Sequence, residues 1–267
     1  MLNPKKSLGQ NFLIDKNIIK KIVLLGKIKK ADVLEIGAGT GNLTNEILKH
    51  APRKIILVEK DFKLCQVLNE KFNIKKSIEI LNNDILNLNI ENKINKNCTI
   101  FGNLPYNIST QILVKLIKLK VWPPKYKKLI FMFQKEVAER ILAKHNSSQY
   151  GRLSIMTNWR LKITDSFRVS KNCFYPKPKV DSTIIVFEPV VNKIYKIKNI
   201  NNLEKITQIF FSRKRKMINK GFSKLFKNSL FFSKKLNIDL TLRPSQISRD
   251  HYYKITECYE KYGKNIK

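Results

Sequence analysis

FGNLPYNIST, at residues 101–110, follows an apolar, β-branched segment that is typical of a buried strand. Within it, Pro105 has a fixed φ and no N–H, and it keeps the preceding residue extended. The main chain is therefore predicted to turn at the end of the strand. Either Ser109 or Thr110 is expected to cap the amphipathic helix that comes next.

This turn carries groups suited to an amine on an aromatic ring. The Asn103 side-chain oxygen lies beside outward-facing main-chain carbonyls, and Tyr106 supplies a flat ring. Such groups can accept hydrogen bonds from an exocyclic amine while stacking on its ring. The same residues also fit an ordinary strand–turn–helix junction, and the segment alone does not distinguish the two interpretations.

A glycine-rich turn, GAGTG at residues 37–41, follows an earlier predicted strand. Glycines let the main chain turn tightly and approach a ligand at the start of the next helix. The G-x-G-x-G spacing differs from the G-x-G-x-x-G of dinucleotide enzymes. The following strand ends in Glu59, which is placed to accept both hydroxyls of a ribose. A solvent-exposed acid at a strand end would give the same sequence.

Each of the first predicted strands ends in polar or glycine-rich residues. Asn82-Asn83-Asp84 follows the third strand, and FGNLPY ends the fourth. This alternation of strands and helices predicts a doubly wound α/β sheet with ligands at the carboxyl ends of the strands. The segment 152–159 is compatible with either helix or strand, and the prolines of 174–182 are expected to exclude regular structure there.

Net charge is the dominant global property of the chain. There are 53 basic and 20 acidic residues, which gives a formal charge of +33 and favours a nucleic-acid partner. Only nine of the basic residues are Arg, while Lys, Asn and Ile are abundant, so part of the charge reflects a codon bias. The basic run Arg213-Lys214-Arg215-Lys216 lies near phenylalanines and suits phosphate contacts, although a solvated helix end is an equal alternative.

Cysteines and histidines give no sign of a metal site. The four cysteines are scattered without a C-x-x-C pair, which fits a reducing cytoplasm, and none of the three histidines has a triad-like context. We find no signal peptide and no apolar run of membrane-spanning length, and we expect neither a membrane nor a metal to be involved.

Taken together, these motifs resemble the ribosomal RNA adenine dimethyltransferase family over nearly the whole chain. The resemblance extends through the RKRK and RPSQIS stretches of the helical tail, and Asp181 favours the small-subunit enzymes over the resistance-conferring large-subunit group, where Asn is expected. The motifs that carry it are SLGQNFL (7–13), VLEIGAGTG (33–41), Glu59, Asp84, FGNLPYNIST (101–110), MFQKEVAERI (132–141), YGRLS (150–154) and FYPKPKVDS (174–182).

The resemblance implies a class I, Rossmann-like methyltransferase fold with a seven-stranded, mostly parallel sheet and a small all-α C-terminal domain. It implies a catalytic domain at 1–190, a linker at 191–202 and a helical domain at 203–267 that contributes to rRNA binding. The implied cofactor is S-adenosylmethionine.

The resemblance also implies roles for individual residues. Asn11 and Leu13 would close over the cofactor, and Gly37 and Gly39 would approach its methionine part. Glu59 would hold the ribose, and Asp84 the adenine amine. Asn103 would line the methyl-transfer pocket with Leu104, Pro105 and Tyr106, and Phe174 would stack on the target base opposite Tyr106. RNA contacts would come from Arg213, Lys214, Arg215 and Lys216.

The expected function is dimethylation of N6 on two adjacent adenosines in a hairpin loop near the 3′ end of small-subunit rRNA. The expected partner is the immature small subunit, and the protein is expected to act as a cytoplasmic monomer. Alternatives are a resistance-type large-subunit enzyme, an adenine-N6 DNA methyltransferase and a non-catalytic RNA-binding assembly or transcription factor. A nicotinamide dehydrogenase is disfavoured because the glycine spacing is wrong.

Overall fold

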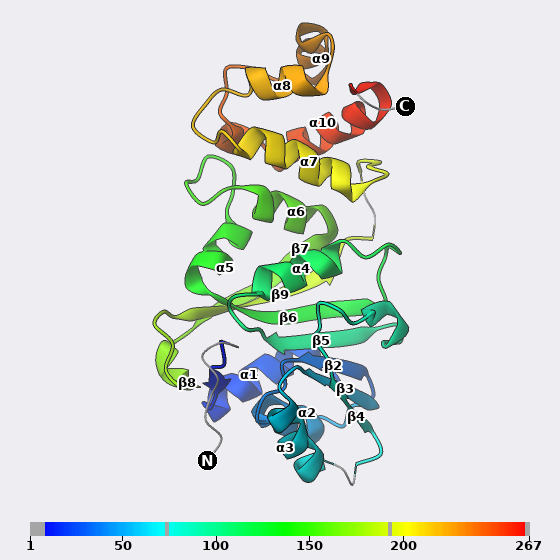
Figure 1. Cartoon of the computed structure of the whole chain (residues 1–267), viewed down its shortest axis with the longest axis vertical. Helices are drawn as coiled ribbons and strands as arrows, with labels where there is room; N and C mark the ends of the chain where they lie inside the picture. The colour runs from blue at the N-terminus through cyan, green and yellow to red at the C-terminus, as the bar shows by residue number, and fades with distance from the viewer. Residues whose placement is uncertain (1–8, 73–74, 192–193, 265–267) are drawn as a thin grey trace. The chain divides into compact units, whose positions relative to one another are not determined.

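The computed structural model describes residues 9–72, 75–191 and 194–264, and the chain forms two compact units (Figure 1). The first unit comprises Met1–Ala138 and Leu161–Pro189, and the second comprises Glu139–Arg160 and Val190–Lys267. None of the described helices combines the length and apolar character needed to cross a membrane.

A seven-stranded sheet forms the centre of the first unit and confirms the predicted fold class. Its strand order is β4-β3-β2-β5-β6-β9-β7, and Figure 1 shows the strands side by side in this order. Neighbouring strands are parallel except where β9 pairs with β6 and β7. The strands are β2 (Asp32–Ile36), β3 (Lys54–Glu59), β4 (Ile78–Asn82), β5 (Cys98–Asn103), β6 (Tyr126–Gln134), β7 (Leu161–Val169) and β9 (Ser182–Pro189).

Helices lie before, between and after the parallel strands, which can be joined only by crossover connections. The first of them begins at a side-chain cap, because Asp15 accepts hydrogen bonds from the main-chain N–H groups of Asn17 and Ile18. These helices are α1 (Lys16–Gly26), α2 (Asn42–Lys49), α3 (Phe62–Phe72), η2 (Ile90–Asn92), α4 (Ser109–Ile117) and α5 (Lys135–Leu142), and the division between the two units falls within α5.

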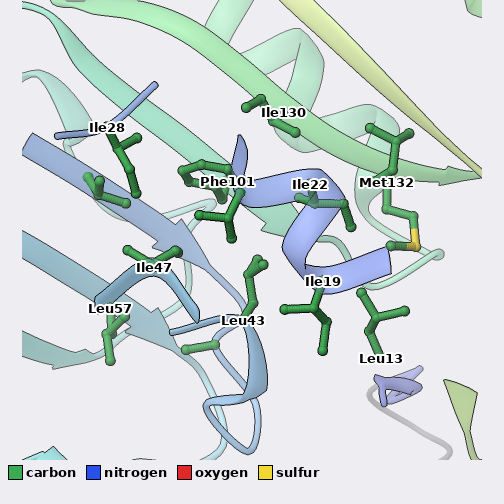
Figure 2. Close-up of a cluster of buried hydrophobic side chains, with 14 of the residues drawn as sticks. Leu13, Ile19, Ile22, Ile28, Leu43, Ile47, Leu57, Phe101, Ile130 and Met132 are labelled. Carbon is green, nitrogen blue, oxygen red and sulfur yellow. The ribbon is translucent and has the colours of Figure 1, made fainter. Parts of the chain in front are cut away.

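The core of the first unit joins α1 and α2 to the sheet. Figure 2 shows Ile19 and Ile22 of α1 and Ile47 of α2 in one cluster with side chains of the sheet, including Phe101. The last residue of α1 is Gly26, where an added Cβ would lie 2.5 Å from Phe101 Cζ. Glycine therefore lets the end of α1 approach β5 closely. The cluster includes Ala38, so the glycine-rich turn at 37–41 is packed against this core.

Two short segments far apart in the sequence pair outside the main sheet. β1 (Phe12–Leu13) is antiparallel to β8 (Phe174–Tyr175), with Leu13 opposite Phe174. The prediction that 174–182 contains no regular structure is therefore wrong at Ser182, where β9 begins, and at Phe174 and Tyr175. Phe174 and Tyr175 both precede Pro176, so their N–H groups remain available for pairing.

The cap predicted for the helix after the FGNLPY motif is also wrong. α4 begins at Ser109 itself, after an Ile108 that makes no side-chain cap hydrogen bond. Ser109 Oγ instead donates to the carbonyl of Tyr106 at 3.2 Å. The hydroxyl thus stabilises the preceding turn and does not cap the free N–H groups of the first turn of α4.

The second unit is helical, and residues 139–160 belong to it, whereas the predicted catalytic domain ran from 1 to 190. The ambiguous segment at 152–159 is helical. Its packing explains the grouping, because Tyr253 Oη donates to the carbonyl of Ile155 at 3.0 Å and the Tyr253 ring packs 4.9 Å from that of Trp159. The helices are α6 (Arg152–Arg160), α7 (Ile200–Phe211), α8 (Asn219–Leu225), α9 (Ser229–Leu236), η4 (Pro244–Gln246) and α10 (Arg249–Tyr262).

Residues 198 and 199 of the predicted linker at 191–202 are hydrogen-bonded to the last helix, α10. Glu260 of α10 accepts hydrogen bonds from the main-chain N–H groups of Lys198, at 2.7 Å, and Asn199, at 2.9 Å. Helix α7 then begins at Ile200, three residues before the predicted domain start. The functional roles assigned to the two domains stay predictions.

Candidate active site

Four neighbouring strands of the first unit end at a cavity of about 220 Å³. The cavity lies where β2 and β5 are adjacent, at the point where the strand order reverses. Doubly wound sheets bind their ligands at this position. The lining residues are 9–12, 36–37, 39, 58–60, 64, 83–86 and 103–108.

The glycine-rich turn forms one wall of the cavity. Gly37, Gly39 and Gly41 have φ angles of 72°, 57° and 79°, a region that side-chain-bearing residues rarely adopt. An added Cβ on Gly39 would lie 3.1 Å from the ring of Phe12, and one on Gly37 would lie 3.6 Å from the Asn103 carbonyl oxygen. Glycine at these positions therefore keeps the main chain close to both neighbouring segments.

The Glu59 side chain links the glycine-rich turn at 37–41 to Asp61, just after the end of β3. The side chain is 7% exposed, and its two oxygens accept hydrogen bonds of 2.9 Å from the N–H groups of Gly39 and Asp61. Burial raises the pKa of the carboxyl, and the hydrogen bonds from these N–H groups oppose that rise. Each oxygen keeps a second lone pair, so the fixed carboxyl can accept the two hydroxyls of a sugar.

Asp84 lines the cavity after the end of β4 and is held by two donors. Its Oδ1 accepts from the N–H of Leu86, and its Oδ2 accepts from Lys60 Nζ, both at 2.9 Å. The hydrogen bond from Lys60 lowers the pKa of the carboxyl, which favours the ionised form. An ionised carboxylate is an acceptor only, as recognition of an amino group requires.

Asn103 has a defined orientation at the end of β5. Its Nδ2 donates to the carbonyl of Asn11 at 2.9 Å, and Asn11 Nδ2 donates to the carbonyl of Gly9 at 3.3 Å. The bond from Asn103 joins two segments that are 92 positions apart. With the amide nitrogen used in this way, the oxygen of the Asn103 amide is the acceptor available to a ligand.

Tyr106 is fixed by a partner from a distant motif. Its hydroxyl lies 2.8 Å from Ser182 Oγ at the start of β9. Burial raises the pKa of the phenol, and the hydrogen bond to Ser182 opposes that rise. The ring is therefore neutral and held at one angle, while Leu104 and Pro105 line the cavity beside it.

Most of the predicted catalytic and cofactor-binding residues meet at this cavity, but two of them do not. Phe174 is 3% exposed and packs in the core with Leu13, whereas its neighbour Tyr175 is 63% exposed. Leu13 instead borders a smaller cavity of about 30 Å³. The predicted residues that line the main cavity are Asn11, Gly37, Gly39, Glu59, Asp84, Asn103, Leu104, Pro105 and Tyr106.

Sequence reasoning missed several side chains at or beside the site. Gln10, Phe12 and Lys60 line the cavity, and Lys60 directly follows the predicted Glu59. Glu35 is 2% exposed and borders the smaller cavity. Thr44 Oγ1 donates to it at 2.7 Å, while burial raises the pKa of Glu35 to about 8. An acidic residue between the apolar Leu34 and Ile36 of a buried strand was the available signal for Glu35.

The predicted RNA-binding residues lie in the second unit. Residues 213–216 form an exposed turn between the end of α7 and the start of α8. Lys214 Nζ donates to the carbonyl of Ser148. The turn borders a groove with Lys220, Lys224 and Arg243, and no acidic side chain is among the described residues that line this groove. The groove is therefore suited to an extended polyanion.

The composition of the main cavity fits S-adenosylmethionine. Apolar side chains, among them Val58, Leu64 and Ile108, suit the faces of a purine ring. The Asp84 carboxylate suits the purine amine, the Glu59 carboxyl suits a ribose diol, and the turn at 37–41 leaves room for the amino-acid part. The donors and acceptors are thus spaced along the cavity in the order in which those groups occur in the cofactor.

Comparisons with known proteins agree on one family. The model of the family described as ribosomal RNA adenine dimethylase matches residues 1–261. The ribosomal RNA small subunit methyltransferase A of Pelagibacter ubique is 46% identical over 259 residues, covering 96% of this chain and 97% of that protein. The protein of the same name from Rhizobium johnstonii is 39% identical over 227 residues, covering 84% of this chain and 82% of that one.

Solved structures show the same architecture. A dimethyladenosine transferase from Plasmodium falciparum has a TM-score of 0.81 at 27% identity, with 94% of this chain and 99% of that chain covered. A 23S rRNA methyltransferase has a TM-score of 0.69 at 21% identity, with 93% and 99% covered, and at this identity it bears on the fold alone.

Proposed function

The chain belongs to the ribosomal RNA adenine dimethylase family, and from this membership we propose that it dimethylates N6 of adenosines in small-subunit ribosomal RNA. The observation that carries the proposal is that the Asn103–Tyr106 motif lines the same cavity as Glu59 and Asp84. We propose S-adenosylmethionine as the methyl donor and two adjacent adenosines in a hairpin loop near the 3′ end of the RNA as the target.

The small subunit is the favoured substrate because of the relatives. Two relatives at 46% and 39% identity carry the name of a small-subunit enzyme. Asp181 gives little independent support, because its Oδ1 accepts from the N–H of Lys171 at 3.0 Å, a bond that an Asn oxygen would also make. The proposed partner is the immature small ribosomal subunit, which places the reaction in the cytoplasm.

S-adenosylmethionine supplies a methyl group that is already activated by its sulfonium. The protein must then bring an amine lone pair into line with that group, and alignment of this kind supplies up to roughly 7–11 kcal/mol of a barrier. In the proposed mechanism the Asn103 oxygen and the Leu104 carbonyl accept hydrogen bonds from the N6 amine of adenine. These bonds favour a pyramidal nitrogen and expose its lone pair. A dedicated base is not required, because the methylated amine can lose its proton to water.

The target base must leave its stack to reach the cavity. Tyr106 provides one aromatic face, and its bond to Ser182 fixes the angle of the ring. The predicted partner face, Phe174, is buried against Leu13. In this arrangement Phe174 supports β1, which directly follows Asn11, and Tyr106 is the ring that we assign to stacking.

We assign RNA contacts outside the active site to the basic groove of the second unit. Its cations are exposed, and its described lining contains no carboxylate to compete with phosphate. Contacts of this kind supply affinity and orientation without reading sequence. The choice of adenosine therefore rests on the cavity at the ends of the strands.

Methylation of purified ribosomal subunits tests the proposal. The protein is incubated with isotope-labelled S-adenosylmethionine and with unmethylated small or large subunits, and modified adenosines are located by mass spectrometry. We expect two adjacent dimethyladenosines in the small subunit and none in the large one. Labelling of the large subunit would instead support the resistance-type enzyme, and cofactor binding without transfer would support a non-catalytic assembly factor.

A further inference from the structure

Lys115, in the last turn of α4, directs all three N–H donors of its ammonium group to one loop. Its Nζ donates to the carbonyls of Ile85 at 2.9 Å, Leu86 at 2.6 Å and Leu88 at 2.8 Å. An ammonium group has three N–H donors, and all three are used here. Bonds from a charged donor are shorter and stronger than neutral ones. A surface lysine with no structural role does not converge on three carbonyls in this way.

The loop held by Lys115 forms one wall of the active-site cavity. Asp84, Ile85 and Leu86 all line that cavity. The loop is a tight turn, since the N–H groups of Asn87 and Leu88 donate to the carbonyl of Asp84 at 2.9 and 3.1 Å. The Asp84 side chain accepts from the N–H of Leu86 in the same turn. The direction of the Asp84 carboxylate therefore depends on the conformation of this loop.

The helix that carries Lys115 begins at the other wall. Residues 103–108 line the cavity, and α4 starts at Ser109. Lys115 thus connects the turn that carries Asp84 to the helix that follows the Asn103–Tyr106 motif. The ammonium also lies near the Asp84 charge, which opposes the fall in the pKa of Lys115 that burial causes. A methionine at this position would keep the aliphatic stem but leave three carbonyls without their donor.

We propose that Lys115 is a positioning residue for cofactor recognition, which fixes the turn at 84–88 so that the Asp84 carboxylate meets the 6-amino group of the cofactor's purine. This inference rests on the proposed function, because it takes an adenine-containing cofactor as the ligand. It assigns Lys115 a part in selectivity for the amino group as well as a part in holding the fold.

Selectivity for the 6-amino group separates this role from a purely structural one. S-adenosylhomocysteine carries the amine, and S-inosylhomocysteine carries a carbonyl oxygen at the same position, which would face the Asp84 carboxylate. The ratio of the two dissociation constants reports how well that carboxylate is placed. A general loss of folding would weaken both ligands by the same factor and leave the ratio unchanged.

Binding of both ligands is measured by calorimetry on the full-length protein and on variants, with thermal unfolding followed in parallel. The parent is expected to prefer S-adenosylhomocysteine by at least about tenfold, as loss of a charge-assisted hydrogen bond implies. Lys115→Met should reduce this preference to within about threefold of unity, and Lys115→Arg should restore most of it. Lys120→Met, in the exposed segment after α4, is the matched control and should keep the parental ratio.

Asp84→Asn provides the second half of the test. If Lys115 acts through Asp84, adding Lys115→Met to Asp84→Asn should not change the ratio further, since coupled residues are not additive. A parental ratio in Lys115→Met, with both ligands weakened equally, would overturn the inference and leave Lys115 a structural residue. If Lys115→Met does not fold, a Lys115→Gln variant with the parental ratio would overturn it equally. A parent protein that binds neither ligand would overturn the proposed function itself.

Discussion

The amide of Asn103 is oriented before any substrate arrives, because its nitrogen is used by the carbonyl of Asn11. Preorganised groups of this kind stabilise charge or geometry that develops only in the transition state. The acceptor oxygen is therefore the part of the side chain that the mechanism needs. The donor nitrogen serves the N-terminal segment.

Asn103→Ala is expected to lower the single-turnover rate of methylation by about 10²–10³-fold, the cost of losing a comparable preorganised partner. Cofactor and RNA affinities should change far less, because Tyr106 and the cofactor residues remain. Asn103→Asp keeps an acceptor and loses the donor, so it separates the two functions of the amide. Rapid-quench kinetics measures the effect, and Asn69→Ala on the exposed face of α3 is the control. Dimethylation at the parental rate by Asn103→Ala would contradict the mechanism.

The buried carboxyl of Glu35 is expected to make the free energy of unfolding depend on pH. Its pKa is raised from 4.5 to about 8 in the folded protein by burial, so folding favours the protonated form. The resulting stability is full below pH 4.5 and is lost as the pH rises through about 8. A shift of this size corresponds to roughly 4–5 kcal/mol in the free energy of unfolding.

We expect Glu35→Gln to remove this dependence, so that its stability relative to the parent rises from pH 5 to pH 9. Urea unfolding at several pH values measures the difference. The matched control is Glu70→Gln, at an exposed position of α3. A constant difference between Glu35→Gln and the parent across this range would show that Glu35 is ionised in the folded protein.

Sequence reasoning succeeded for residues whose position follows from the ends of parallel strands. Glu59, Asp84 and Asn103 each end or follow a strand, and the carboxyl ends of neighbouring parallel strands meet at one edge. It did not find Lys115, whose partners are main-chain carbonyls of a loop almost thirty positions earlier. Main-chain carbonyls leave no pattern in the side-chain sequence, so such a contact emerges only from the fold.

At the scale of secondary-structure elements, the end of β5 depends on a missing side chain. An added Cβ on Gly102 would lie 2.4 Å from Leu104 Cδ2 and 3.2 Å from the ring of Phe131. Leu104 therefore folds back over the strand only because Gly102 leaves space for it. The sequence predicted the turn from Pro105, but it did not predict this packing.

Gly102→Ala is expected to displace Leu104 from the cavity and to destabilise the fold by about 1–3 kcal/mol, the usual cost of overpacking. Methylation should fall with it, because the carbonyl of Leu104 moves as well. Chemical unfolding and single-turnover kinetics on one preparation measure both effects. Gly151→Ala is the matched control, because an added Cβ there would meet only Phe211, at 3.9 Å. Parental stability in Gly102→Ala would show that Leu104 can repack.

Helix boundaries show where local rules stop being sufficient. Asp15 caps α1 in the way that local rules describe, because its side chain accepts from the N–H groups of Asn17 and Ile18. Ser109 does not cap α4, because its hydroxyl reaches the Tyr106 carbonyl in the turn before it. The segment 152–159 resisted prediction for another reason. Its side chains are buried almost all round, so neither a helical nor a strand period is visible.

At the scale of the whole molecule, the charge of +33 must be separated into functional and incidental parts. Neutralising Arg213, Lys214, Arg215 and Lys216 should weaken RNA binding and flatten its salt dependence by about 0.7–0.9 log units for each phosphate that the variant no longer neutralises. Cofactor affinity should not change. The control neutralises four exposed lysines of the first unit, and binding is measured as a function of salt. If the variant had the same salt dependence of RNA binding as the parent, residues 213–216 would be solvated side chains that do not contact RNA. The control residues are Lys20, Lys29, Lys30 and Lys76.

The order in which the chain visits its two units has a consequence for its synthesis. Residues 139–160 belong to the helical unit, yet they precede the last strands of the sheet. As the polypeptide emerges from a ribosome, α6 appears early. Roughly ninety more residues must then be synthesised before Tyr253 of α10 can pack against Trp159. The sheet can close once β9 has emerged, while the helical unit cannot. A nascent chain stalled near residue 190 would therefore present a complete sheet and an α6 whose Trp159 still lacks its partner Tyr253.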